Sequence, residues 1–189
     1  MEISLQKMSG SMIILGSVLF LIAAFLPISR VFPEPSAVRK LEIIRDAPNA
    51  WLVAQICFAL GALVTVIGIA LVAYRFRDQS FAVLMQGSMP VLVLGALLWI
   101  WHVYARTVDP AAFAEGALPA WPLVLYFYLT PTGLAFFGVA LLRSALPPWV
   151  GWLMIGSMAL FFVITVIFRD IPPFVFYVIT LVIGVVLYR

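Results

Sequence analysis

Six separate apolar stretches, each long enough to cross a bilayer as a helix, fill almost all of this 189-residue chain. A hydrocarbon core about 30 Å thick requires roughly 20 apolar residues per helical span, so six spans and short loops would use the whole chain. Hydrophobic residues make up 65% of the sequence and charged residues 10%, whereas soluble domains are about half apolar and a quarter charged. The sequence therefore predicts a single transmembrane domain, an all-α bundle of six transmembrane helices.

The predicted spans are bounded by prolines and charged residues. A transmembrane β-barrel is excluded, because the apolar runs are continuous and too long for alternating strands. The spans cover about residues 9–28, 51–74, 81–104, 121–142, 149–168 and 172–188.

The first connection contains a predicted interfacial helix at about residues 36–46, which we expect to lie along the bilayer surface. Its apolar residues recur with helical spacing, and charged residues occupy the opposite face. Ser36 is the predicted N-cap and Pro48 the predicted stop. Residues 109–116 predict a second, shorter interfacial helix on the same side. The apolar face of the first helix comprises Ala37, Val38, Leu41 and Ile44.

Basic residues sit at the ends of the spans, where they anchor helices and set orientation, so they do not indicate nucleic-acid binding. Six spans would place both termini and the loops at 75–80 and 143–148 on one side. The raw counts on the two sides barely differ, but four of the basic residues on the other side come from the long first connection. We therefore expect both termini in the cytoplasm. The terminal side carries Lys7, Arg75, Arg77, Arg143 and Arg189, and the other side carries Arg30, Arg39, Lys40, Arg45, Arg106 and Arg169.

His102 and Arg106 form the first part of a candidate ligand or proton site, because they lie one helical turn apart on one face. The alternative is a histidine in an interfacial aromatic belt. We expect both side chains at head-group level, with Arg106 paired to an acid such as Asp109, Glu115 or Asp170. On the interfacial reading, His102→Ala costs little stability, because the imidazole keeps access to water.

Gln86, Thr130 and Thr132 complete the candidate site. Gln86 is the most buried-looking amide and lies on the face of its span opposite His102. The two threonines flank Pro131, which we expect to bend the fourth span. Transporters bind substrates at such breaks, but a structural role is the alternative, since threonines can satisfy backbone freed by proline.

No catalytic residue, cofactor site or metal site is predicted, and the nature of any cofactor is left open. A single histidine excludes bis-histidine haem and a multi-ligand zinc site within the chain, and Cys57 has no partner for a disulfide. No ionisable residue lies at midplane depth in any span, where ion-coupled transporters usually keep one. Gly61 and Gly68 share one face of the second span and predict close helix packing.

The segment Arg143-Ser144-Ala145-Leu146-Pro147-Pro148-Trp149-Val150-Gly151-Trp152 resembles the junction between spans in small bacterial six-span integral membrane proteins of uncharacterised function. The ending Asp170-Ile171-Pro172-Pro173-Phe174, followed by an apolar helix with Gly184, resembles theirs as well. The resemblance is confined to about residues 140–189. It implies a six-helix fold in a bacterial cytoplasmic membrane and supplies no activity.

These features favour a non-catalytic integral membrane protein, either a subunit of a larger membrane assembly or a binder of a lipophilic molecule. One alternative is a transporter or channel for a small neutral or hydrophobic solute. A second alternative is a membrane enzyme that uses His102 and Arg106. The expected partners are the lipid bilayer and either other membrane subunits or a lipophilic small molecule, without nucleic acid.

Overall fold

The computed structural model describes residues 4–168 and 173–189. This part of the chain contains helices and no strand, which confirms the predicted all-α class. The helices are α1 (Leu5–Phe25), the 3-10 helix η1 (Pro27–Val31), α2 (Ala37–Asp46), α3 (Pro48–Arg75), α4 (Ala82–Val108), α5 (Pro110–Glu115), α6 (Trp121–Leu141), α7 (Pro148–Phe168) and α8 (Phe174–Tyr188).

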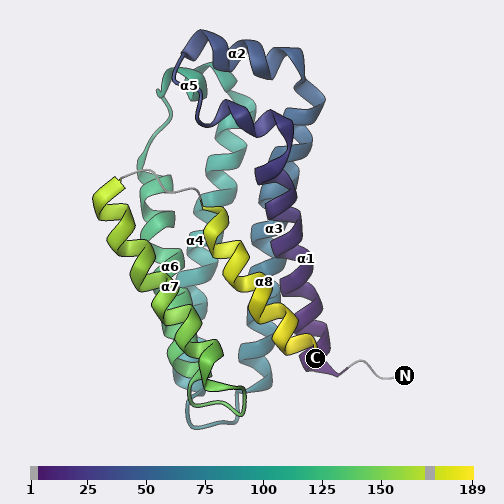
Figure 1. Cartoon of the computed structure of the whole chain (residues 1–189), viewed down its shortest axis with the longest axis vertical. Coiled ribbons are helices and arrows are strands. Elements are labelled where there is room, and N and C mark those ends of the chain that lie inside the picture. The colour runs from purple at the N-terminus through teal and green to yellow at the C-terminus, as the bar shows by residue number, and fades with distance from the viewer. Residues whose placement is uncertain (1–3, 169–172) are drawn as a thin grey trace.

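Six helices stand side by side and enclose a common core (Figure 1). Neighbouring contacts run in the order α8, α1, α3, α4, α6 and α7, and α7 returns to α8 through the least extensive contact of the ring. Both termini and the α3–α4 and α6–α7 loops lie at one end, which we call the terminal end. At the opposite end η1, α2 and α5 form a cap layer, with α2 lying across the bundle.

Five helices, α1, α3, α4, α6 and α7, are long and apolar enough to cross a membrane. By their length and composition, these helices identify the chain as an integral membrane protein. α8 has 15 residues, or about 22 Å at 1.5 Å per residue, which is shorter than a typical hydrocarbon core. The start of the sixth predicted span at residue 172 lies outside the described residues, so a sixth complete span stays a prediction.

The predicted interfacial helix at 36–46 is confirmed as α2, and the Ser36 hydroxyl accepts a hydrogen bond from the Arg39 amide at 3.3 Å. Its buried residues are Ile43 and Ile44, whereas Val38 is 69% exposed. Val38 of the predicted apolar face therefore does not pack against the bundle, and the packed side of α2 is the side of Ile43 and Ile44. The short second helix is confirmed as α5, capped by Asp109 and ended by Gly116 with φ 70°.

α2 ends at Asp46, two residues before Pro48, as predicted, and Pro48 also begins α3. The first turn of a helix tolerates proline, because its missing amide would have no intrahelical partner there. Ala47, with φ −140° and ψ 59°, is the residue that separates the two helices. α3 consequently begins three residues before the predicted span at Trp51.

α6 continues as a helix through Pro131. The Thr132 hydroxyl donates to the Tyr128 carbonyl at 2.6 Å, so it does not pair the Phe127 carbonyl that proline leaves without a donor. The span is not interrupted at Thr130–Thr132, and the predicted bend in its axis stays a prediction.

Glycines let α1 approach both α3 and α8 closely. A Cβ atom at Gly61 would lie 2.8 Å from the Phe20 amide nitrogen and 2.9 Å from the Gly16 carbonyl oxygen. A Cβ atom at Gly68 would lie 2.8 Å from the Ile13 amide nitrogen. The predicted packing role of Gly61 and Gly68 is therefore supported by backbone contacts that a side chain would have to push apart.

Gly61→Leu and Gly68→Leu should each lower the unfolding temperature in detergent strongly, because backbone atoms of α1 would have to move. Gly156→Ala is the matched control, since nothing lies within 4 Å of the position of its added Cβ atom. This control should be neutral or stabilising by about 0.5–1 kcal/mol, as alanine favours helix over glycine. Equal stability of all three variants would show that α1 does not depend on these close contacts.

Candidate functional site

The most unusual side chain of the structure is Arg106, which lies in the last turn of α4 and is 3% exposed. Its Nε atom donates a hydrogen bond to the Gln55 Oε1 atom of α3 at 2.6 Å. No carboxylate of the described residues lies within ion-pairing distance of Arg106, because the ion pairs found there are Arg39–Glu42 and Arg77–Asp78. A guanidinium is thus buried with an amide as its partner instead of an acid.

Four aromatic rings surround this guanidinium. Its central carbon lies 4.9 Å from the ring centre of Phe32, 5.1 Å from those of Phe58 and Trp99, and 6.0 Å from that of Trp51. Ring faces carry negative partial charge and attract cations, typically by about 0.5–2 kcal/mol for each pair. We call these four rings together with Gln55 the Arg106 cage.

Helical spacing explains how three elements build the cage. Trp51, Gln55 and Phe58 follow one another at intervals of four and three residues, so they share one face of α3. Trp99 and Arg106, seven residues apart, share one face of α4 in the same way.

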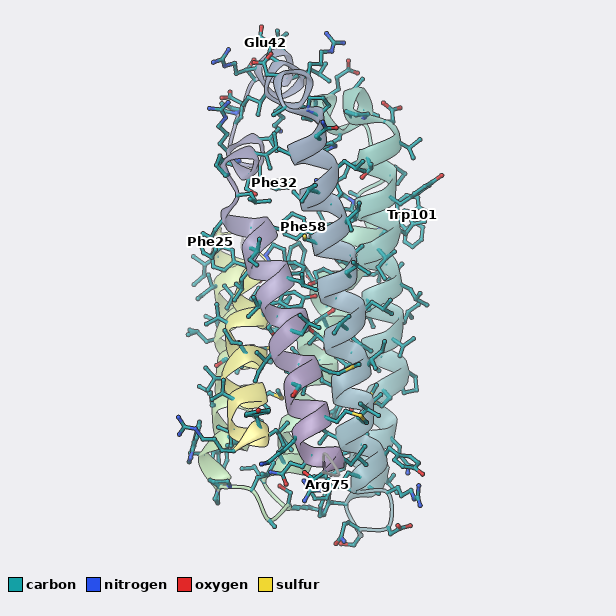
Figure 2. All side chains as sticks on the ribbon, turned by 90° about the vertical axis from the view of Figure 1, so that its right-hand side faces the viewer. Phe25, Phe32, Glu42, Phe58, Arg75 and Trp101 are labelled. Atoms are coloured by element: carbon teal, nitrogen blue, oxygen red, sulfur yellow. The ribbon has the colours of Figure 1, made fainter. Side chains whose placement is uncertain are left out.

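Phe32 follows η1 and enters from the cap layer, as Figure 2 shows beside Phe58. Phe113 of α5 lies on the outer side of the cage, with its ring centre 5.5 Å from that of Trp51. The cap layer therefore provides one ring of the cage, Phe32, and a further ring, Phe113, that packs against Trp51.

Buried polar atoms without a hydrogen-bond partner gather in this region, and nearly all of them are donors. They are Arg106 Nη2, Gln55 Nε2, Trp51 Nε1 and Trp99 Nε1, together with His102 Nδ1. The first four can donate and cannot accept. Leaving such donors unpaired is costly in a low-dielectric interior, so the cage favours a group that accepts hydrogen bonds, above all an anion.

His102 and Arg106 are brought together as predicted, but their surroundings differ from the prediction. His102 is 7% exposed and lies against Trp99, with ring centres 6.1 Å apart. The expectation that it keeps access to water is therefore wrong. Pairing of Arg106 with Asp109 or Glu115 is also wrong, and Asp170 lies outside the described residues.

Gln86 is exposed on the outside of the bundle, so its prediction as the buried amide is wrong. It precedes His102 by 16 residues, a rotation of about 160° along a helix, and an inward His102 forces Gln86 outward. Gln55, at 2% exposed, is the amide that enters the site. Thr132 bonds its own helix and does not join the cage.

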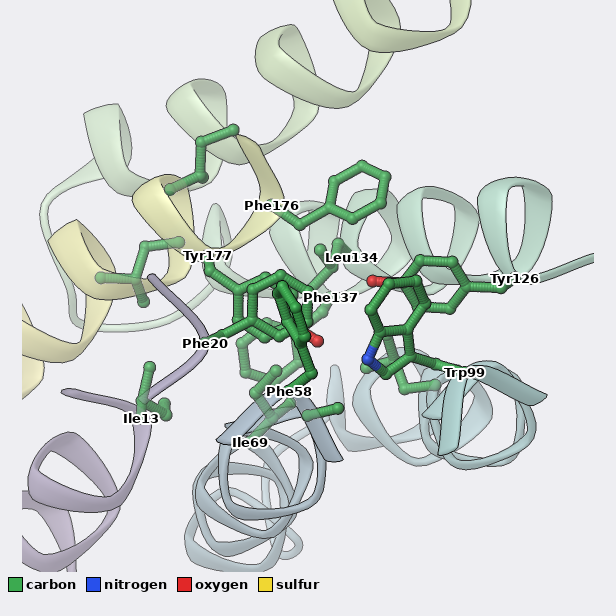
Figure 3. Packing of buried hydrophobic residues seen from close by; sticks show 14 of the residues in the cluster. Ile13, Phe20, Phe58, Ile69, Trp99, Tyr126, Leu134, Phe137, Phe176 and Tyr177 are labelled. Carbon is green, nitrogen blue, oxygen red and sulfur yellow. The ribbon is translucent and has the colours of Figure 1, made fainter. Parts of the chain in front are cut away.

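Thr130 belongs to a separate polar feature deeper in the bundle. An internal cavity of about 20 Å³ is bounded by α3, α4, α6 and α8, and the unpaired hydroxyls of Thr65, Tyr126 and Thr130 lie in its wall. A site of this size and polarity holds about one water molecule. Tyr126 connects it to the cage, since its ring centre lies 4.8 Å from that of Trp99 (Figure 3).

The donor set of the cage suits an acceptor ligand and does not suit a metal ion. Within residues 4–168 and 173–189, no group of three or more His, Cys, Asp or Glu side chains is placed to hold a metal. Comparison with protein-family models, curated proteins and solved structures found no match to this chain. The Arg106 cage is therefore the feature of the molecule that bears on its function.

The cage was missed from the sequence because its members looked ordinary one at a time. Trp99 suits an aromatic belt at the membrane interface, and Gln55 suits a hydrogen bond between helices. The available signal was the 51–55–58 spacing, which places two aromatic rings and an amide on one face of an apolar helix. That pattern could not reveal that Arg106, 51 residues away, lies opposite.

Gln55→Leu should lower the free energy of unfolding by about 2–3 kcal/mol, because it leaves the Arg106 guanidinium without its hydrogen bond. The double variant Gln55→Leu/Arg106→Met should recover most of this loss, since both polar groups are removed and the volume is kept. Reversible unfolding in mixed micelles measures both. If the double variant is no more stable than Gln55→Leu, burial of the charge is not the source of the cost.

Proposed function

We propose that this protein is a non-catalytic binder of a lipophilic molecule whose polar group accepts hydrogen bonds, and that this group is held by the Arg106 cage. The observation that carries the proposal is a fully buried guanidinium with one amide partner, four rings and no acid within reach among the described residues. A carboxylate or phosphate would pair the free Nη2 donor and neutralise the charge. The surrounding rings would contact the apolar part of the same molecule.

The depth of the cage in the bundle supports an amphipathic ligand. α4 has 27 residues, or about 40 Å, which exceeds a hydrocarbon core of about 30 Å. Its last turn, with Arg106, therefore reaches the head-group region if the helix starts at the opposite surface. A lipid-soluble acid places its carboxylate at this depth and its chain in the membrane.

The cap layer supplies the route by which such a molecule would reach the guanidinium. Phe32 forms the cap side of the cage, and its ring centre lies 6.1 Å from that of Phe113. Lys40 of α2 lies 5.7 Å from the Phe113 ring centre and adds a positive charge on this approach. Displacement of aromatic side chains, without movement of the long helices, would open the site.

The two alternatives have less support. A solute pathway through a broken fourth span is not favoured by the uninterrupted α6. An enzyme that uses His102 and Arg106 would need a further reacting group, and the neighbours found for these two residues are an amide and aromatic rings. Membership of a larger assembly is compatible with ligand binding and stays a separate hypothesis.

A dibrominated fatty acid should quench the tryptophan fluorescence of the protein in detergent saturably, because bound bromine would lie near Trp51 and Trp99. Arg106→Met should weaken this quenching by roughly tenfold to a hundredfold, as it removes charge-assisted hydrogen bonds worth about 1.5–3 kcal/mol. Arg45→Met is the matched control, because Arg45 is an exposed cation of α2.

The methyl ester of the same acid separates head-group recognition from partition into micelles. It should quench weakly and without dependence on Arg106, since an ester carries no charge. Equal quenching by acid and ester, or equal affinity of the wild type and Arg106→Met, would refute the proposal.

A further inference from the structure

A second feature lies on the outside of the bundle, between α3 and α4 near the terminal end. It is an open groove of about 540 Å³. Its floor and walls combine small and flexible apolar side chains, and one end carries polar groups. The apolar part is lined by Ala70, Ala73, Met89 and Val93, and the polar end by Tyr74, Arg77 and Gln86 beside Pro90.

The polar end presents a cation at the boundary of a membrane span. Arg77 lies two residues beyond the end of α3, and its guanidinium is held over the Tyr74 ring at 4.2 Å. Its contact with Asp78 is 3.5 Å long, and the Asp78 side chain is 84% exposed. Such a solvent-exposed pair is weak, so Arg77 keeps donors available for an anion.

Gln86 adds hydrogen-bonding groups at the same end of the groove. It lies about 6 Å along α4 from the first residue of that helix, and its side chain is exposed on the bundle surface. Pro90 has no amide hydrogen, so the main-chain carbonyl of Gln86 lacks its helical donor. An exposed amide and a carbonyl without its helical donor, close to a cation, favour a polar head group over a hydrocarbon chain.

The charge of the terminal end selects the sign of that head group. Among the described residues this end carries five basic side chains and one acidic, whereas the cap end carries five of each. The residues at the terminal end are Lys7, Arg75, Arg77, Arg143, Arg189 and Asp78. The residues at the cap end are Arg30, Arg39, Lys40, Arg45, Arg106, Glu34, Glu42, Asp46, Asp109 and Glu115. A basic membrane surface of this kind attracts anionic lipids.

We propose that the α3–α4 groove binds one anionic phospholipid, with its phosphate at Arg77 and Gln86 and an acyl chain along Ala70, Ala73 and Met89. The site is independent of the Arg106 cage, which lies at the other end of α4.

Native mass spectrometry of the detergent-purified protein, titrated with phosphatidylglycerol or phosphatidylcholine, tests this proposal. The wild type should retain one phosphatidylglycerol, with phosphatidylcholine bound roughly tenfold more weakly. Arg77→Gln and Gln86→Leu should each weaken phosphatidylglycerol binding by about tenfold, the effect of losing one charge-assisted hydrogen bond. Both positions are exposed, so the unfolding temperatures of the lipid-free variants should equal that of the wild type.

Arg143→Gln is the matched control, because Arg143 is a basic residue at the same end and does not line the groove. It should keep wild-type binding. If Arg143→Gln weakened phosphatidylglycerol binding as much as Arg77→Gln does, the lipid would be attracted to the basic surface in general. That result would overturn the specific site. Equal binding of both lipids would overturn the proposal as well. So would a dimer that excludes lipid when it forms and that is lost in Gln86→Leu.

Discussion

The close approach of α1 to α3 and α8 is the constraint on which the rest of the bundle depends. Helices in lipid gain little from hydrophobic association, so close packing must hold them together. Glycines at the α1–α3 contact bring backbone to within van der Waals distance, and the Ser17 and Thr180 hydroxyls join α1 to α8 at 2.9 Å. This arrangement stacks Phe20 on Tyr177 at 3.6 Å and fixes the aromatic core beneath the cage.

The Arg106 cage packs against this core, and it is the part of the structure whose burial costs the most free energy. Burial of a charge costs several kcal/mol even after relaxation. Four rings, at about 0.5–2 kcal/mol each, and one hydrogen bond offset part of that cost. Methionine at position 106 would occupy a similar volume without burying a charge. A local departure of this kind from favourable packing is typical of a functional site.

The two ends of the molecule differ in the way they present charge. Among the described residues, the charges at the cap end balance in number, and Arg106 is buried beneath Phe32, which follows η1, and Phe113 of α5. At the terminal end the excess basic residues are exposed, and a groove joins one of them to the lipid-facing surface. A protein built in this way would hold an amphipathic ligand at one surface and be anchored to anionic lipid at the other.

The sequence by itself determined the helical class, the approximate positions of the five long apolar helices, the cap of α2 at Ser36 and the shared face of His102 and Arg106. All of these depend on composition or on spacing within one helix. The tertiary structure decided that Gln55, rather than an acid, meets Arg106, that Gln86 faces outward, and that Thr65 and Thr130 share a cavity. The spans are apolar around their whole circumference, so no hydrophobic face fixes how each helix is rotated. That rotation is set by packing between helices distant in sequence, and it determines which side chains meet.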